Sequence, residues 1–246
     1  MLSNSDGFDL SLESQEQILP GMTEQMLKAL AGSLIVSCQA SGNHPMRNTD
    51  AIVRMASSAL LGGASALRIN SPPDVRAVRA ITDVPIIGLD KEPGRMRNVI
   101  TVRPDQAAVL AAAGANIVAV DATSEVTDDI QGHLRQAGIA AGVPIMADVS
   151  TLEEGLMAWD SGVGLVGTTL SGYTPYTLRG DLRPDIELVA ALSSRGVRVI
   201  AEGRYVTPAE VRGAFDAGAF AVVVGGAITD PVAITRRFVA ATTRQQ

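Results

Sequence analysis

Two residues of opposite charge are the strongest candidates for acid–base chemistry. Lys91 follows a short apolar run at residues 86–89, and Glu202 follows another at residues 197–201. Lys91 is also one of only two lysines among 20 basic residues. A lysine in a partly dry cavity near arginines has a lowered pKa and can act as a base, which an arginine cannot. The pair therefore suits proton abstraction next to a carbonyl group, or Schiff-base chemistry.

A candidate phosphate site lies in the two loops near the end of the chain. The first loop carries Gly203 and Arg204, and the second carries Gly225 and Gly226 ahead of a segment, 227–234, that can form a short helix. Bare glycine amides can approach an anion, and the loops after the last two strands of (β/α)8 barrels form the usual phosphate site. We therefore predict phosphate binding at these four residues. The alternative for the glycine pair is a simple turn.

Eight short apolar runs without polar alternation can supply the strands that position these loops. They lie at residues 34–38, 66–69, 86–89, 117–120, 145–147, 165–168, 197–201 and 221–224. Such runs are typical of parallel strands buried on both faces. Helix-ending glycines at positions 63, 114, 162 and 218 are 51, 48 and 56 residues apart, about two strand–helix units each. This repeat favours a single-domain α/β fold, a (β/α)8 TIM barrel, over a doubly wound open sheet, and 246 residues suit it.

The barrel is expected over residues 23–246, after a loosely ordered, polar and acidic N-terminal extension at residues 1–22. A short helix capped by Thr23 is suited to covering the bottom of the barrel.

Polar residues or bare glycines follow every predicted strand, at the end where barrel enzymes carry their sites. They are Gln39, Arg68, Asn70, Asp90, Lys91, Asp121, Thr123, Asp148, Thr168, Thr169, Glu202, Arg204, Gly225 and Gly226. A structural barrel has no need for so many buried charges, because each is costly to desolvate. Asp121 and Asp148 could instead cap helices, and Arg68 could pair with a carboxylate inside the barrel as a brace.

Composition excludes several other classes of protein. The net charge of −6 and the lack of a basic run argue against nucleic acid, and no apolar stretch approaches the length of a membrane span. Cys38 is the single cysteine and is expected to be an inert core thiol, while His44 and His133 have no metal-ligand spacing, so we predict no metal site. No leader segment is evident, and a cytoplasmic location is expected.

Short strings of sequence at each predicted strand carry a further signal. They are Leu34-Ile-Val-Ser-Cys-Gln-Ala40, Arg68 with Asn70, Pro85-Ile-Ile-Gly88 with Lys91, Val120-Asp-Ala-Thr123, Met146-Ala-Asp-Val-Ser-Thr-Leu-Glu-Glu154, Thr168-Thr-Leu-Ser-Gly-Tyr-Thr174, Ile200-Ala-Glu-Gly-Arg204 and Val222-Val-Val-Gly-Gly-Ala-Ile-Thr229. Together these strings resemble the N-acetylmannosamine-6-phosphate 2-epimerase family. The likeness covers about residues 33–240 and is specific because something matches at every strand.

The resemblance implies interconversion of N-acetylmannosamine 6-phosphate and N-acetylglucosamine 6-phosphate at C2, in sialic acid catabolism, without a cofactor. Lys91 would remove and return the C2 proton, and Glu202 would assist. The phosphorylated amino sugar would be the partner, and a homodimer is expected by analogy. Substrate contacts are expected from Gln39, Arg68, Asp121, Thr169 and Arg204, with the phosphate at the four residues named above.

Two departures from the family pattern stand out. Family members often carry an arginine-proline-rich segment where this chain has Ser124-Glu-Val-Thr-Asp-Asp129, and often arginine where it has Asp230. Two alternatives stay open beside the epimerase. One is an enzyme on another phosphorylated sugar, such as a pentose-phosphate epimerase or an aldolase. The other is a phosphosugar sensor that has lost turnover.

Overall fold

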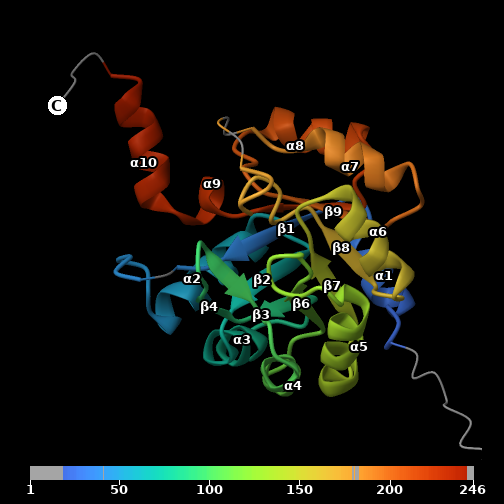
Figure 1. Cartoon of the computed structure of the whole chain (residues 1–246). Helices are drawn as coiled ribbons and strands as arrows, with labels where there is room; N and C mark the ends of the chain where they lie inside the picture. The colour runs from blue at the N-terminus through green and yellow to red at the C-terminus, as the bar shows by residue number, and fades with distance from the viewer. Residues whose placement is uncertain (1–18, 41, 179, 181–182, 243–246) are drawn as a thin grey trace, which may run out of the picture.

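The computed structural model describes residues 19–40, 42–178, 180 and 183–242. Within these ranges eight parallel strands form a closed barrel. Helices surround the barrel on its outside (Figure 1). The predicted (β/α)8 barrel is therefore confirmed.

The barrel strands are short, as strands buried on both faces usually are. They are β1 (Ser33–Cys38), β2 (Ala66–Asn70), β3 (Ile86–Leu89), β6 (Ile117–Asp121), β7 (Ile145–Asp148), β8 (Leu165–Gly167), β9 (Val199–Glu202) and β10 (Ala221–Val224). The helices are α1 (Glu24–Leu30), α2 (Thr49–Leu61), α3 (Pro72–Arg79), α4 (Pro104–Ala112), α5 (Ile130–Ala141), α6 (Leu152–Asp160), α7 (Ile186–Ser193), α8 (Pro208–Asp216), α9 (Gly226–Thr229) and α10 (Pro231–Ala240). Around the barrel the strands neighbour one another in the order β1-β10-β9-β8-β7-β6-β3-β2. All eight predicted strands form, with end points that differ by at most two residues.

The repeating glycines have one structural task. Gly63, Gly114, Gly162 and Gly218 each follow a helix and have φ between 88° and 106°, a conformation that other residues rarely adopt. Each lets the chain turn sharply from a helix into the next strand. The sequence repeat is thus a repeat of backbone conformation.

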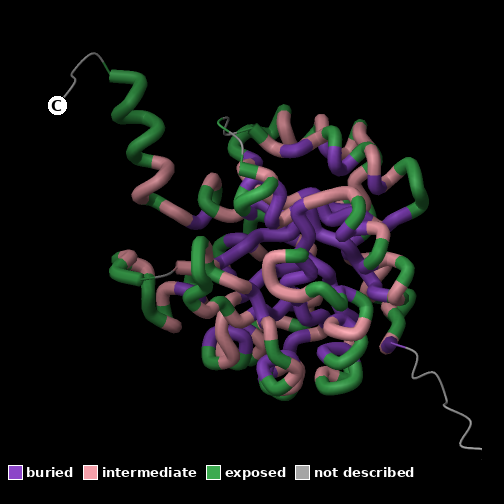
Figure 2. The backbone as a smooth tube through the Cα atoms, in the orientation of Figure 1, coloured by how far each residue is buried: buried purple, intermediate pink, exposed green. Residues whose placement is uncertain are grey.

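Two apolar layers hold the barrel together. Ile35, Ile87, Met146 and Ile200 belong to the cluster inside the barrel, and Leu30 of α1 joins it with no exposed surface. A second cluster packs the outer faces of the strands against the helices. Figure 2 shows this buried interior surrounded by exposed helix surfaces. Thr23 accepts a hydrogen bond from the Met26 amide, which confirms the predicted capped helix.

Three features were not anticipated from the sequence. Strands β4 (Lys91–Pro93) and β5 (Asn98–Ile100) form an antiparallel hairpin in the loop after β3. Helix α10 stands away from the barrel and buries no residue (Figure 1). Leu19, inside the predicted extension, is buried and packs against Gly138. Residues 1–18 of that extension lie outside the described ranges.

No helix in the described part of the chain is long and apolar enough to span a membrane.

Candidate active site

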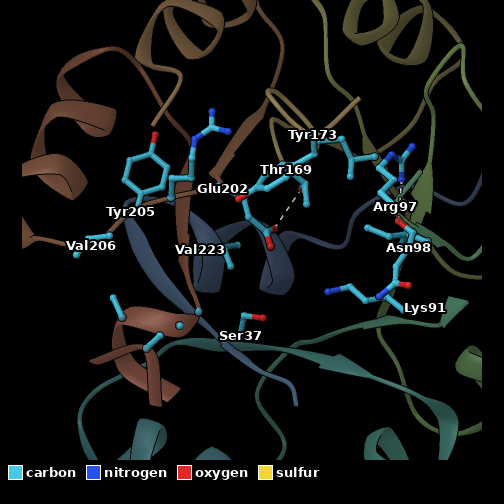
Figure 3. Close-up of a pocket in the computed structure, with 18 of the residues that line it drawn as sticks. Ser37, Lys91, Arg97, Asn98, Thr169, Tyr173, Glu202, Tyr205, Val206 and Val223 are labelled. Carbon is cyan, nitrogen blue, oxygen red and sulfur yellow. Dashed lines mark hydrogen bonds between the residues drawn. The ribbon is translucent and has the colours of Figure 1, made fainter. Parts of the chain in front are cut away.

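A cavity of about 660 Å³ opens at the end of the barrel where the strands finish. Seven of the ten predicted site residues line it: Lys91, Thr169, Glu202, Gly203, Arg204, Gly225 and Gly226. Lys91 and Glu202 approach it from different elements, and in the view of Figure 3 Ser37 lies below Glu202 and to the left of Lys91. Closure of the barrel brings together loops that are more than 100 residues apart in the sequence.

Lys91 begins the hairpin and is positioned through its backbone. Its amide donates to Asn70 Oδ1 at 2.9 Å, and the hairpin pairs Lys91 with Ile100. The residue is open to solvent through the cavity mouth, yet the surrounding protein and the charge of Arg68 lower the pKa of its ammonium group. Glu202 and Asp148 act in the opposite direction. Lys91 is therefore easier to deprotonate than an ordinary lysine.

One buried guanidinium holds the carboxylates beneath Lys91. Arg68, whose side chain is 1% exposed, bonds Asp148 through both terminal nitrogens, at 3.2 and 2.5 Å. Its Nη1 also lies 2.9 Å from Glu202 Oε2. Thr169 Oγ1 bonds the Asp148 carboxylate at 2.6 Å. Arg68 and Asp148 thus form an internal brace.

The charges of Arg68, Lys91, Asp148 and Glu202 sum to zero when all four groups are ionised. Burial raises the pKa of Glu202, and Asp148 raises it further, while Arg68 and Lys91 lower it. Lys91 makes no salt bridge within 4.0 Å to any described carboxylate. A space between the lysine and Glu202 is therefore open to a substrate. Loss of the Lys91 proton leaves one excess negative charge, which a proton on Glu202 can offset.

Arg97 is a residue of the cavity wall that was not predicted from the sequence. It lies in the hairpin turn, and its guanidinium bonds Asp121 at 2.6 and 3.1 Å and Glu125 at 2.9 Å. Its remaining donors reach Asn98 O and Thr123 Oγ1. All of its N–H groups are occupied, so Arg97 anchors the hairpin that carries Lys91. No spacing rule could have identified it, because it follows no barrel strand.

The other three predicted residues lie one layer behind the cavity wall. Arg68 and Asp121 are occupied as described above, and Gln39 donates to Ser37 Oγ at 2.8 Å. The Oε1 atom of Gln39 is buried without a hydrogen-bond partner among the described residues. Direct contact between these three side chains and a substrate stays a prediction.

The two departures from the family pattern have clear local roles. Glu125 of the 124–129 segment pairs with Arg97, and Asp129 caps α5 through the Gly132 amide. Asp230 caps α10 through the Ala233 amide at 2.9 Å, and its Oδ1 lies 3.1 Å from His44 Nε2.

Backbone strain marks the loop after β9. Gly203 has φ 111° and Arg204 has φ 63°, so two successive residues have positive φ, which is costly for arginine. The guanidinium of Arg204 lies over the Tyr173 ring, 5.2 Å from its centroid, and Nε donates to Arg183 O at 2.7 Å. A side chain at Gly172 would collide with this guanidinium. The strained turn therefore presents Arg204 to the cavity beside Gly225 and Gly226.

Burial raises the pKa of Cys38 to about 12, as expected of a core thiol. His133 lies on α5 and is partly buried, and its Nε2 atom has no hydrogen-bond partner in the described structure. The described residues contain no group of three metal-binding side chains.

Comparison with known proteins identifies the family. Residues 52–244 match the family model described as "Putative N-acetylmannosamine-6-phosphate epimerase". The chain belongs to the N-acetylmannosamine-6-phosphate 2-epimerase family. Two relatives carry the name "Putative N-acetylmannosamine-6-phosphate 2-epimerase". The protein of Cutibacterium acnes is 40% identical, and the match covers 89% of this chain and 98% of the relative. The protein of Yersinia pseudotuberculosis is 44% identical, and the match covers 81% of this chain and 85% of the relative.

A solved structure supports the same assignment. The N-acetylmannosamine-6-phosphate 2-epimerase of Clostridium perfringens superposes with a TM-score of 0.81 at 38% identity. The match covers 88% of this chain and 96% of the clostridial one. The family resemblance predicted from the sequence is thus confirmed.

Proposed function

We propose that the protein interconverts N-acetylmannosamine 6-phosphate and N-acetylglucosamine 6-phosphate, as an isomerase of amino-sugar catabolism. The observation that carries this proposal is Lys91, a lysine with a lowered pKa in a cavity that also contains Glu202 and a glycine-rich loop. The sugar would bind with its phosphate at the glycine loop and its C1–C2 end between Lys91 and Glu202.

The proton at C2 is acidic only while C1 is an open-chain aldehyde. In the proposed reaction, the neutral amine of Lys91 takes this proton, and the C–H electron pair moves into the C1–C2 bond to leave an enolate. The ammonium then returns a proton to the opposite face of C2 after the intermediate has turned. No atom is gained or lost, so the reaction balances without an oxidant or reductant.

Glu202 is proposed to steer the hydroxyl and carbonyl groups while the intermediate turns. Its raised pKa allows it to carry a proton when Lys91 is neutral. Arg68 lies against Glu202 and contributes positive potential beneath the developing enolate. Thr169, Ser37 and Asn98 supply further polar groups of the wall.

The decisive experiment is proton NMR of N-acetylmannosamine 6-phosphate in heavy water with purified protein. Appearance of the gluco epimer deuterated at C2 would support both the reaction and the proton transfer. Binding without conversion or exchange would support the sensor. Conversion of a different sugar phosphate, with this one inert, would support an enzyme of another specificity.

We also propose that the chain functions as a homodimer joined through α10. Phe238 is 74% exposed and Val239 50%, although both are apolar. An apolar groove on the barrel beside α8 is lined by Val211, Phe215 and Ile228, where a last barrel helix would ordinarily lie. The α10 of a second copy would cover this groove. A mass of two chains in light scattering, reduced to one by Phe238→Asp, would support the dimer, and a monomeric native protein would exclude it.

The cytoplasm is the proposed location, because phosphorylated sugars are charged and stay in the compartment where they are formed.

A further inference from the structure

Arg237 is a cation at the cavity that the mechanism above leaves unused. It lies on α10, and it lines the cavity together with Ala233, Gly225, Gly226 and Arg204. Arg237 follows no barrel strand, so reading the strand ends could not find it.

The partners of the arginines around the cavity differ. Arg68 and Arg97 are each paired with two carboxylates. Arg237 forms no salt bridge within the described part of the chain, and neither does Arg204. The two guanidinium groups without a described carboxylate partner therefore lie at the glycine-rich end of the cavity, where they can bind an anion.

Helix geometry directs Arg237 toward the glycine loop. Side chains on a helix lean toward its N-terminus, and α10 begins at Pro231, directly after the segment from Gly225 to Asp230. Ala233 lies one turn before Arg237 on the same side, and its small side chain leaves room for the guanidinium. Phe238 is the next residue and points about 100° around the helix, so the apolar side proposed for dimer contact differs from the side of Arg237.

Asp230 caps α10 but does not neutralise Arg237. Its carboxylate is engaged by the Ala233 amide and by His44. It does not line the cavity. The acidic residue nearest to Arg237 in the sequence is therefore paired elsewhere, which leaves the guanidinium group available to an anion.

We propose that Arg237 binds the substrate phosphate, acting with Arg204 as a two-sided clamp around the glycine loop. A guanidinium group presents paired N–H donors that match two phosphate oxygens. This inference rests on the proposed epimerase, and it adds a specificity-determining residue for the phosphorylated form of the sugar.

The test compares Arg237→Gln with Arg236→Gln, because Arg236 is the adjacent exposed arginine and does not line the cavity. Arg237→Gln should raise KM for N-acetylmannosamine 6-phosphate by about tenfold or more, with kcat within about twofold. Inhibition by inorganic phosphate should weaken in parallel, and binding of unphosphorylated N-acetylmannosamine should not change. Arg236→Gln should behave as the native protein, and equal thermal midpoints would establish that both variants fold.

An unchanged KM and an unchanged phosphate inhibition in Arg237→Gln would overturn the proposal, and so would an equal loss in both variants. If the native protein does not epimerise this sugar, the proposed function fails. Calorimetric titration with inorganic phosphate then still decides the role of Arg237, because weaker binding in Arg237→Gln alone supports it and equal binding excludes it.

Discussion

The two ends of the cavity differ in whether their arginine side chains are paired with carboxylates. Beneath Lys91, the guanidinium of Arg68 is buried and shared by Asp148 and Glu202. At the glycine-rich end, Arg204 and Arg237 face the cavity without a described carboxylate partner. A reaction centre must have its charges fixed before the substrate arrives, because reorganisation would add to the barrier. A binding end instead leaves its cations for the anion to pair with.

The largest effect that this contrast predicts is at Lys91. Lys91→Ala should reduce the rate of C2 proton exchange by about a thousandfold or more. The reason is that Lys91 is the only lysine among the described residues that line the cavity, and its pKa is lowered. Phosphosugar binding should survive, since the phosphate end is unchanged. Deuterium exchange by NMR and calorimetric binding measure the two effects. Lys28→Ala is the matched control, because Lys28 is the other lysine and lies exposed on α1. Exchange at a native rate in Lys91→Ala would refute the assignment.

The next largest effect concerns the brace that Arg68 and Asp148 form beneath Lys91. Asp148→Asn should lower the free energy of unfolding by about 3 kcal/mol, because it leaves the buried Arg68 with a single carboxylate partner. It should also reduce kcat by roughly ten- to a hundredfold, since Glu202 is then held differently. Urea denaturation and the NMR assay check both values. Glu24→Gln, which breaks the exposed pair with Lys28, should leave the denaturation midpoint unchanged. A similar small effect from both variants would show that the brace has no special role.

A smaller effect is expected at the hairpin anchor. Arg97→Met should reduce kcat about tenfold, because the turn loses its bonds to Asp121 and Glu125 and Lys91 becomes less precisely placed. Arg95→Met changes an exposed arginine of the same hairpin and should have little effect. Steady-state kinetics on both variants decide the matter. Equal activities would mean that the hairpin is positioned by its backbone pairing alone.

The smallest effect is a shift in the pH at which Lys91 loses its proton. With only two lysines, carbon-13 labelling of lysine gives two side-chain signals, and Lys28→Arg assigns them. Lys91 should titrate at lower pH than an ordinary lysine, because the surrounding protein and the charge of Arg68 lower its pKa. Glu202→Gln should shift that titration to still lower pH, since Glu202 stabilises the charged form. The rate should rise with pH as Lys91 loses its proton. A titration at the ordinary lysine value, unmoved in Glu202→Gln, would contradict the charge balance described above.

The sequence by itself determined the barrel, its eight strands and seven of the residues that line the cavity. The reason is local: buried strands need unbroken apolar runs, and the helix-to-strand turns at Gly63, Gly114, Gly162 and Gly218 need positive φ. Residues that follow strands must then meet at one mouth, which is why Lys91 and Glu202 were predicted together.

Only the tertiary structure decided which charges pair and which stay open. Arg68 meets Asp148 from 80 residues away, and Arg97 and Arg237 reach the cavity from a hairpin turn and a terminal helix. No local pattern encodes these contacts, because they depend on closure of the barrel and on the path of side chains through space. An arginine near the mouth can therefore brace, anchor or bind, and the carboxylates within its reach decide which.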